Sequence, residues 1–128
     1  MKKVLLILMC LISIQIFANN PDIYFSQTYC TGNGSNFYIN WGSWKHDNPA
    51  CIKINLEDEI ITLAWVNTEE SFKIVDIEDV SDDILIFDAI SEKGDIVKIK
   101  LRVYYNRYNK KHKQIYFIYK NCGVIFEI

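Results

Sequence analysis

Residues 96–103 read Ile-Val-Lys-Ile-Lys-Leu-Arg-Val, and this stretch decides the fold class. Basic and aliphatic residues alternate through it, which is the period of two that places successive side chains on opposite faces of a β-strand. The basic face of the predicted strand carries Lys98, Lys100 and Arg102, and the other face is aliphatic. Such a strand has one face in water and one against a core, as in an antiparallel sheet.

Segments rich in β-branched and aromatic residues recur along the rest of the chain, separated by turn-forming residues. Helical periodicity is nearly absent after the first 18 residues. The expected strands are residues 23–29, 36–44, 51–56, 60–66, 72–77, 84–90, 96–105, 114–119 and 124–128, with turn chemistry at 31–34, 46–49, 67–71, 92–95 and 121–123. The short connectors leave no room for parallel crossovers. We expect an all-β fold, an antiparallel meander of about eight or nine strands that closes into a small barrel and so removes its edges. A two-sheet β-sandwich is the alternative.

Length and composition allow one domain with a real core. The chain has 128 residues, of which 50% are hydrophobic and 14% aromatic, and its formal net charge is -2. This composition excludes a disordered chain, and the near-neutral charge argues against a general binder of polyanions such as nucleic acid.

The first residues have the layout of a secretory signal peptide. Lys2 and Lys3 precede an apolar run over residues 4–17, and Ala18 is followed by polar residues. The run is shorter than the roughly 20 residues of a transmembrane helix, and a lipoprotein signal at Cys10 fits poorly. We therefore expect a signal peptide at 1–18, a single domain at 19–128, no stable membrane insertion, and a periplasmic or secreted location.

Export to an oxidising compartment permits a disulfide among the three remaining cysteines. Counting the chain reversals of a simple meander places Cys51 and Cys122 at one end of the barrel and Cys30 at the other. The sequence thus predicts a Cys51–Cys122 disulfide and a free Cys30. Burial of Cys30, a bond to another chain and chemical reactivity all remain open.

Charge is unevenly distributed along the chain. Acidic residues dominate positions 57–95, whereas positions 98–120 hold basic residues and no acidic ones. Acidic and basic strands that lie side by side would pair across the sheet. The loop residues Lys110, Lys111, His112 and Lys113 are instead candidates for contact with an acidic partner, with a simple solvated turn as the alternative.

No catalytic or metal-binding constellation is recognisable. His46 and His112 lie far apart in the sequence, and no spacing typical of a zinc site is present. The acidic residues between 76 and 83 lack the glycine and the spacing of an EF-hand loop. We expect neither an enzyme nor a cofactor.

Gly42-Ser43-Trp44, near the start of the predicted mature chain and on its first long strand, resembles the Gly-x-Trp motif of the lipocalin and calycin group. This resemblance implies a small-ligand carrier in which Trp44 closes the base of the barrel. The segment Tyr29-Cys30-Thr31-Gly32-Asn33-Gly34, followed by a strand, is similar to the opening of one family of small periplasmic lysozyme inhibitors. The second likeness implies no inhibitory residue in this chain.

Two functions follow as expectations. The first is an exported, non-enzymatic, calycin-like protein that binds a small apolar ligand. The alternative is an inhibitor or immunity-type protein that binds a protein partner through its surface loops. A carrier needs an unfilled interior, whereas an inhibitor needs a filled core and an active loop.

We predict that the exported protein begins at Asn19, because the apolar run is then removed and nothing else in the chain is apolar enough to enter a membrane. N-terminal sequencing of the exported form tests this cleavage. An intact Met1, or a lipid on Cys10, would contradict it.

Overall fold

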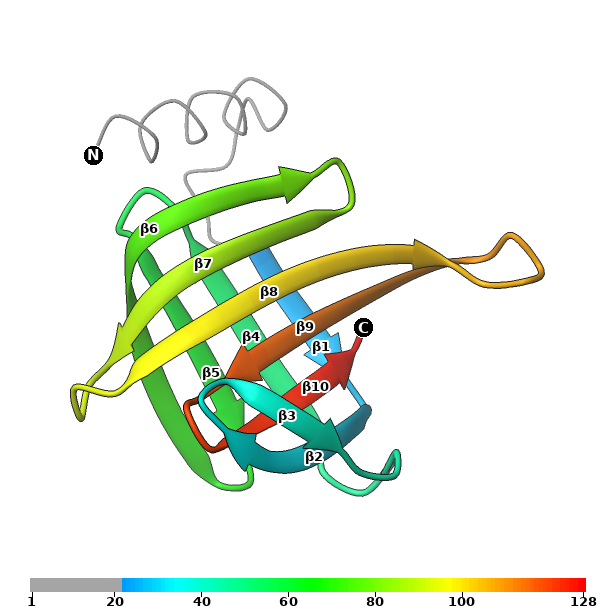
Figure 1. Cartoon of the computed structure of the whole chain (residues 1–128), viewed down its shortest axis with the longest axis horizontal. Coiled ribbons are helices and arrows are strands. Elements are labelled where there is room, and N and C mark those ends of the chain that lie inside the picture. Colours follow the sequence, from blue (N-terminus) through cyan, green and yellow to red (C-terminus); the bar gives the residue numbers. More distant parts are fainter. Residues whose placement is uncertain (1–21) are drawn as a thin grey trace.

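The structure is a computed structural model that describes residues 22–128. The predicted signal peptide, its cleavage point and Cys10 lie outside the described residues. Ten β-strands make up the described part (Figure 1). They are β1 (Asp22–Ser26), β2 (Thr28–Ser35), β3 (Tyr38–Trp41), β4 (Ala50–Asn55), β5 (Ile60–Trp65), β6 (Thr68–Ser81), β7 (Ile84–Ser91), β8 (Ile96–Tyr105), β9 (Lys111–Ile118) and β10 (Cys122–Glu127).

All ten strands form one antiparallel sheet, in the order β1-β4-β5-β6-β7-β8-β9-β10-β2-β3. From β4 to β10 each strand pairs with the next one in the sequence, so this part is a simple meander. The first three strands do not follow that rule: β1 lies beside β4, and β2 lies between β10 and β3. The prediction of an all-β antiparallel fold is therefore confirmed, with one strand more than expected.

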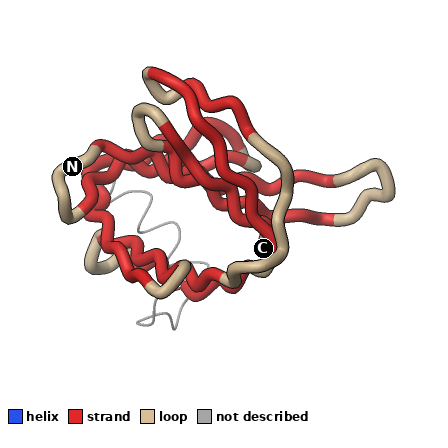
Figure 2. Tube along the Cα trace, turned by 90° about the horizontal axis from the view of Figure 1, so that it is seen from below, coloured by secondary structure: helices blue, strands red, loops and turns tan. Residues whose placement is uncertain are grey.

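The hydrogen-bonded ladder is not closed, because it begins at β1 and ends at β3. The predicted closed barrel is therefore not supported. The sheet nevertheless curls strongly, as Figure 2 shows. Only Gln27 separates β1 from β2, so the chain leaves one end of the meander and joins the other in a single step. At this corner the Ser26 hydroxyl donates to the carbonyl oxygen of Glu127 at 2.7 Å, which ties the end of β1 to the end of β10.

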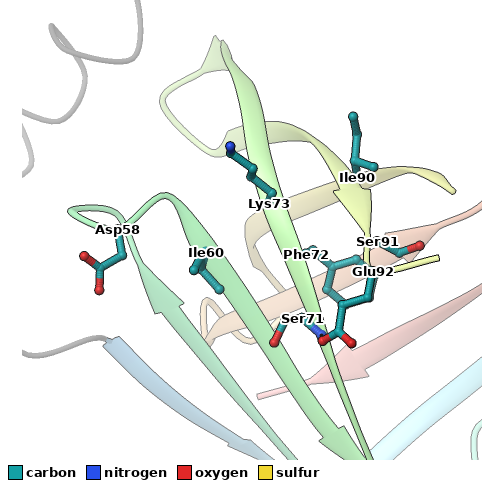
Figure 3. A pocket seen from close by; sticks show the side chains of 8 residues that line it. All are labelled: Asp58, Ile60, Ser71, Phe72, Lys73, Ile90, Ser91 and Glu92. Atoms are coloured by element: carbon teal, nitrogen blue, oxygen red, sulfur yellow. The ribbon is translucent and has the colours of Figure 1, made fainter. Parts of the chain in front are cut away.

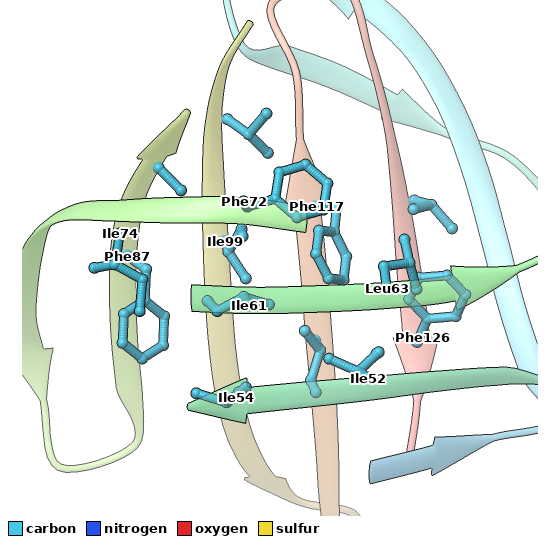
Figure 4. Close-up of a cluster of buried hydrophobic side chains, with 14 of the residues drawn as sticks. Ile52, Ile54, Ile61, Leu63, Phe72, Ile74, Phe87, Ile99, Phe117 and Phe126 are labelled. Atoms are coloured by element: carbon cyan, nitrogen blue, oxygen red, sulfur yellow. The ribbon is translucent and has the colours of Figure 1, made fainter. Parts of the chain in front are cut away.

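The inner face of the curled sheet is filled by large side chains (Figure 4). Phe72, Phe87, Phe117 and Phe126 are each at most 1% exposed. Phe117 contacts both Phe72 and Phe126, with ring centroids 5.3 and 5.9 Å apart. Burial of a side chain of this size contributes about 1.5–3 kcal/mol, so these rings and the aliphatic residues around them hold the strands together.

Residues 31–34 lie inside β2, where a turn was predicted. A Cβ atom on Gly34 would lie 1.8 Å from the carbonyl oxygen of Tyr38, and one on Gly32 would lie 2.4 Å from that of Asn40. These glycines therefore allow β3 to approach β2 closely. The actual turn is Asn36-Phe37, where both residues have positive φ, as a two-residue hairpin turn requires.

A second turn is also shorter than predicted. Residues 68–71 belong to β6, and the connection from β5 consists of Val66 and Asn67 alone. Their φ values are 51° and 59°, the left-handed conformation of the same hairpin turn. Val66 is β-branched, and β-branched residues rarely adopt this conformation. At position 66 the turn therefore lacks the Gly, Asn or Asp that usually marks such a turn in a sequence.

Trp44 does not close the base of the core. It lies in the connection between β3 and β4 and is 43% exposed. Trp65 instead packs against the core, with its ring centroid 4.9 Å from that of Tyr29 and 5.2 Å from that of Phe126. The aromatic residue of the Gly-x-Trp motif is therefore not the one that the core uses.

The predicted Cys51–Cys122 disulfide is not present, because Cys30, Cys51 and Cys122 are all free thiols. Cys51 is opposite Phe25 beside the β1–β2 corner, and that corner meets the end of β10 at Glu127. Cys122 begins β10 and is opposite Asn33. The predicted pairing depended on a count of chain reversals that included a turn at 31–34, where the structure has a strand. The count also took no account of the stagger between neighbouring strands. Stagger matters because a disulfide requires Cα atoms within about 7 Å. Cys30 is free as expected, and it is buried.

We predict that Val66→Asn stabilises the fold by about 1 kcal/mol, because asparagine tolerates the left-handed conformation that costs other residues about 1–2 kcal/mol. The Val66 side chain is 50% exposed, so its removal loses little packing. Urea unfolding measures the effect. Val80→Asn is the control, since Val80 is 56% exposed and its φ is not positive. An equal change in both variants would contradict the proposed backbone strain.

Candidate functional site

The hairpin formed by β8 and β9 extends beyond the rest of the sheet (Figures 1 and 2). The backbone of Val103 still bonds to Asp83, and that of Lys113 still bonds to Ile128. Past these two contacts the two strands pair only with each other, as far as Tyr105 opposite Lys111. We call residues 105–111 the hairpin tip.

Asn106 fixes the conformation of the hairpin tip. Its side-chain oxygen accepts hydrogen bonds from the backbone N–H groups of Tyr108 at 2.9 Å and Lys110 at 3.0 Å. The backbone of Asn106 also bonds to Asn109 and Lys110, and Asn109 has the left-handed φ of 58°. Four hydrogen bonds therefore converge on one residue, and the tip is ordered before any partner binds.

The hairpin tip exposes aromatic and basic side chains together. Tyr105 is 57% exposed and Tyr108 is 74% exposed. The Arg107 guanidinium lies 4.8 Å from the centroid of the Tyr108 ring, and Lys110 and Lys111 are exposed. No acidic residue occurs between positions 98 and 120, so the tip presents positive charge.

A polar cluster around Glu127 supports the base of the same hairpin. One carboxylate oxygen of Glu127 accepts hydrogen bonds from Tyr104 at 3.1 Å and from His112 Nδ1 at 2.9 Å, and the other accepts one from Gln114 at 2.8 Å. Burial, and then the bond to Glu127, raises the pKa of Tyr104. The last strand is thereby tied to both strands of the hairpin.

The hydrogen bonds assign the tautomer of His112. Because the Asn106 oxygen is occupied by two backbone donors, its NH₂ group faces His112 Nε2 at 3.1 Å and donates to it. Nε2 then carries no proton, and Nδ1–H donates to Glu127. His112 thus links the ordered tip to the Glu127 cluster.

The structure separates the four predicted contact residues. Lys110, Lys111 and Lys113 are exposed, but His112 is only partly accessible and belongs to the Glu127 cluster. Lys113 Nζ lies 5.9 Å from the centroid of Tyr24, away from the tip. Sequence reasoning missed Glu127 and Gln114, since no local signal connects residues so far apart. The two asparagines at 106 and 109 were the available sign of an ordered turn.

Few charged side chains of residues 22–128 form ion pairs between the acidic and the basic strands. Within residues 22–128, one lysine or arginine ion pair is found, between Lys98 and Asp88 at 3.6 Å. On β6, Glu78 is opposite Ile86 of β7 and Asp79 is opposite Leu85. Neither carboxylate therefore faces a basic residue across the β6–β7 ladder.

A groove of about 500 Å³ lies at the start of β5, beside the interior of β6 and at the end of β7 (Figure 3). Ile60, Lys73 and Ile90 are paired across these strands and line it. Asp58 and Glu92 add carboxylates, and the Glu92 side chain accepts a hydrogen bond from the backbone of Ser71 at 3.2 Å. The groove therefore mixes apolar and charged groups.

Known proteins give no further guide, because no family model, curated protein or solved structure matches this chain. The all-β antiparallel sheet is compatible with the calycin resemblance, but membership of that group is not shown. Among residues 22–128, no three His, Cys, Asp or Glu residues are grouped so as to hold a metal ion. The same residues include no helix of the length and apolarity that a membrane crossing requires.

We predict that Glu127→Gln lowers the free energy of unfolding by about 1–3 kcal/mol, because an amide NH₂ would then face one of the three donors and leave a half-buried group unsatisfied. Chemical denaturation at neutral pH measures the loss. Glu57→Gln is the matched control, since Glu57 is exposed in the turn after β4. If both variants unfold alike, the cluster does not stabilise the hairpin.

Proposed function

We propose that this chain is an exported, non-enzymatic binding protein whose hairpin tip binds an acidic surface of a protein partner, as an inhibitor or immunity-type protein does. The observation that carries this proposal is an ordered, protruding tip that exposes two tyrosines among basic residues. Tyrosine and arginine are the residue types most enriched among the dominant contacts of protein interfaces.

Order at both ends of the hairpin supports the proposal. Asn106 holds the tip and Glu127 holds the base, with His112 between them. A segment that is already ordered loses less conformational entropy on binding, which is a general source of affinity. Excess positive charge at the tip would also accelerate the encounter with an acidic partner.

The filled interior favours a protein partner over a carrier function. The inward-facing residues of the central strands are almost fully buried against one another, among them Ile52, Ile61, Val97 and Ile99, which are 0% exposed. A calycin-like carrier would need this space for its ligand. Within residues 22–128, the groove beside Ile60 and Ile90 offers a place for a small apolar molecule, and it makes a carrier the second candidate function.

The partner can be identified by photocrosslinking from the hairpin tip. A photoreactive phenylalanine analogue at position 108 should crosslink to one protein in the exported fraction. The same analogue at position 38 is the control, because Tyr38 is 81% exposed on a different hairpin. Identical products from both positions would indicate nonspecific capture and would count against the tip.

We predict that Lys110→Glu with Lys111→Glu slows association with the identified partner about tenfold at low ionic strength and flattens its salt dependence. Stopped-flow kinetics measures the rates. The control is Lys53→Glu with Lys93→Glu, which changes the net charge equally at exposed positions on β4 and in the β7–β8 turn. An unchanged rate in the tip variant, or an equal slowing in the control, would overturn the proposal.

The second candidate has its own test. Mass spectrometry of the native protein before and after denaturation would reveal a small apolar molecule, and Ile90→Lys in the groove should abolish its retention. Such a result would favour the carrier function.

A further inference from the structure

The outer face of β8 carries three basic residues in a row. Lys98, Lys100 and Arg102 alternate with inward-facing residues, so their Cα atoms are spaced by about 7 Å along the strand. Neighbouring strands lie on both sides, with β7 and β9 paired along the whole row. These residues therefore stand in the middle of a sheet face, away from the hairpin tip.

Only the first of the three is neutralised by a neighbour. Lys98 is opposite Asp88 and forms the ion pair described above. Lys100 stands between Ile86 and Tyr116, and within the described part of the chain it has no carboxylate partner. Arg102 stands between Ile84 and Gln114 and has none either.

Both unpaired cations converge on one tyrosine. Lys100 Nζ lies 4.6 Å from the centroid of the Tyr116 ring, and an Arg102 guanidinium nitrogen donates to the Tyr116 hydroxyl at 3.3 Å. Arg102 also lies 5.1 Å from the centroid of Tyr104. The Tyr116 hydroxyl is itself fixed, because it donates to the Gln114 oxygen at 2.9 Å. The Lys100 ammonium is thus held over the Tyr116 ring, and the Arg102 guanidinium is held at the Tyr116 hydroxyl.

This arrangement has an electrostatic cost that the fold does not relieve. Burial, followed by repulsion from Arg102, lowers the pKa of Lys100. Directly across the ladders, the first carboxylates are two strands away: Glu78 on β6, beyond Ile86, and Glu127 on β10, beyond Gln114. Asp88 on β7 lies diagonal to Lys100 and is paired with Lys98. Glu127 already accepts three hydrogen bonds. Two adjacent cations that no carboxylate of residues 22–128 pairs with are a candidate site for an anion from outside.

We propose that Lys100 and Arg102, held at Tyr116, bind a phosphate monoester. A monoester carries a charge of about -1.5 to -2 at neutral pH, which balances the two cations, whereas a single carboxylate would leave one unpaired. Arginine supplies a planar fork of N–H donors and lysine a compact point charge, a combination suited to the several oxygens of a phosphate group. The site uses none of the exposed tip residues and stands independently of the proposed protein partner.

Titration with inorganic phosphate, glucose 6-phosphate and vesicles containing phosphatidic acid tests the site and its source of phosphate. The fluorescence of Trp41 is a local reporter, because its ring centroid lies 5.8 Å from that of Tyr116. We expect saturable binding of at least one of these probes. Binding of the soluble ester indicates a free phosphorylated molecule, and binding of the vesicles alone indicates a lipid headgroup.

Three charge-removing variants on the same strand decide the assignment. Lys100→Gln and Arg102→Gln should each weaken phosphate binding about fivefold or more, because each removes a charge-assisted contact. Lys98→Gln removes the same charge from a residue that is already paired, and it should change the affinity less than about twofold. Arg102→Lys keeps the charge without the fork and should fall between these limits.

Thermal unfolding of each variant verifies that the fold is intact. The proposal is overturned if no probe binds saturably to the wild-type protein. It is also overturned if Lys98→Gln weakens binding as much as the other two variants do, since the attraction would then be diffuse and not a site.

Discussion

Packing of the inner face is the constraint on which the rest of the structure depends. Phe72, Phe87 and Phe117 come from neighbouring parts of the meander and are almost fully buried. Because side chains alternate across a strand, a shift of the register by one residue would move all the buried side chains of that strand to the solvent-exposed face. The core therefore fixes the register of the strands that contribute side chains to it. It also fixes which residues face outward, and both the cations at Tyr116 and the Glu127 cluster are consequences of that register.

The core decides which residues lie on the outer face of the sheet, and there a chain of side-chain hydrogen bonds adds further order. Glu127, His112 and Asn106 form a continuous chain of hydrogen bonds from the last strand to the loop of the hairpin. Each donor in it has one acceptor available, so the chain has a single consistent arrangement of protons. A surface held by these partly buried hydrogen bonds keeps its shape, and that property distinguishes the hairpin tip from an ordinary charged turn.

Strand content was predictable from the sequence because it depends on local periodicity. Residues 96–105 were expected as a strand and form β8 with the same bounds. The glycines at 32 and 34 were misread, since glycine serves both turns and close strand approach and only the partner strand reveals which. Val66 gave no sign of its left-handed turn. The path of β1 and β2, the state of the cysteines and the Glu127 cluster all depend on contacts between distant residues, which a local pattern does not encode.

The one-residue step between β1 and β2 has a consequence for how the chain acquires its fold. Strand β2 pairs with β10, and the Ser26 hydroxyl reaches an oxygen 101 positions further along the chain. Closure of so long a loop is slow, because its entropy is lost before the contacts that it permits are formed. Strand β2 can pair with β10 only after residues 122–127 have been synthesised, whereas β1 can pair with β4 earlier. A growing chain therefore lacks the β2–β10 ladder until β10 has been made, so this ladder is among the last parts of the sheet to form.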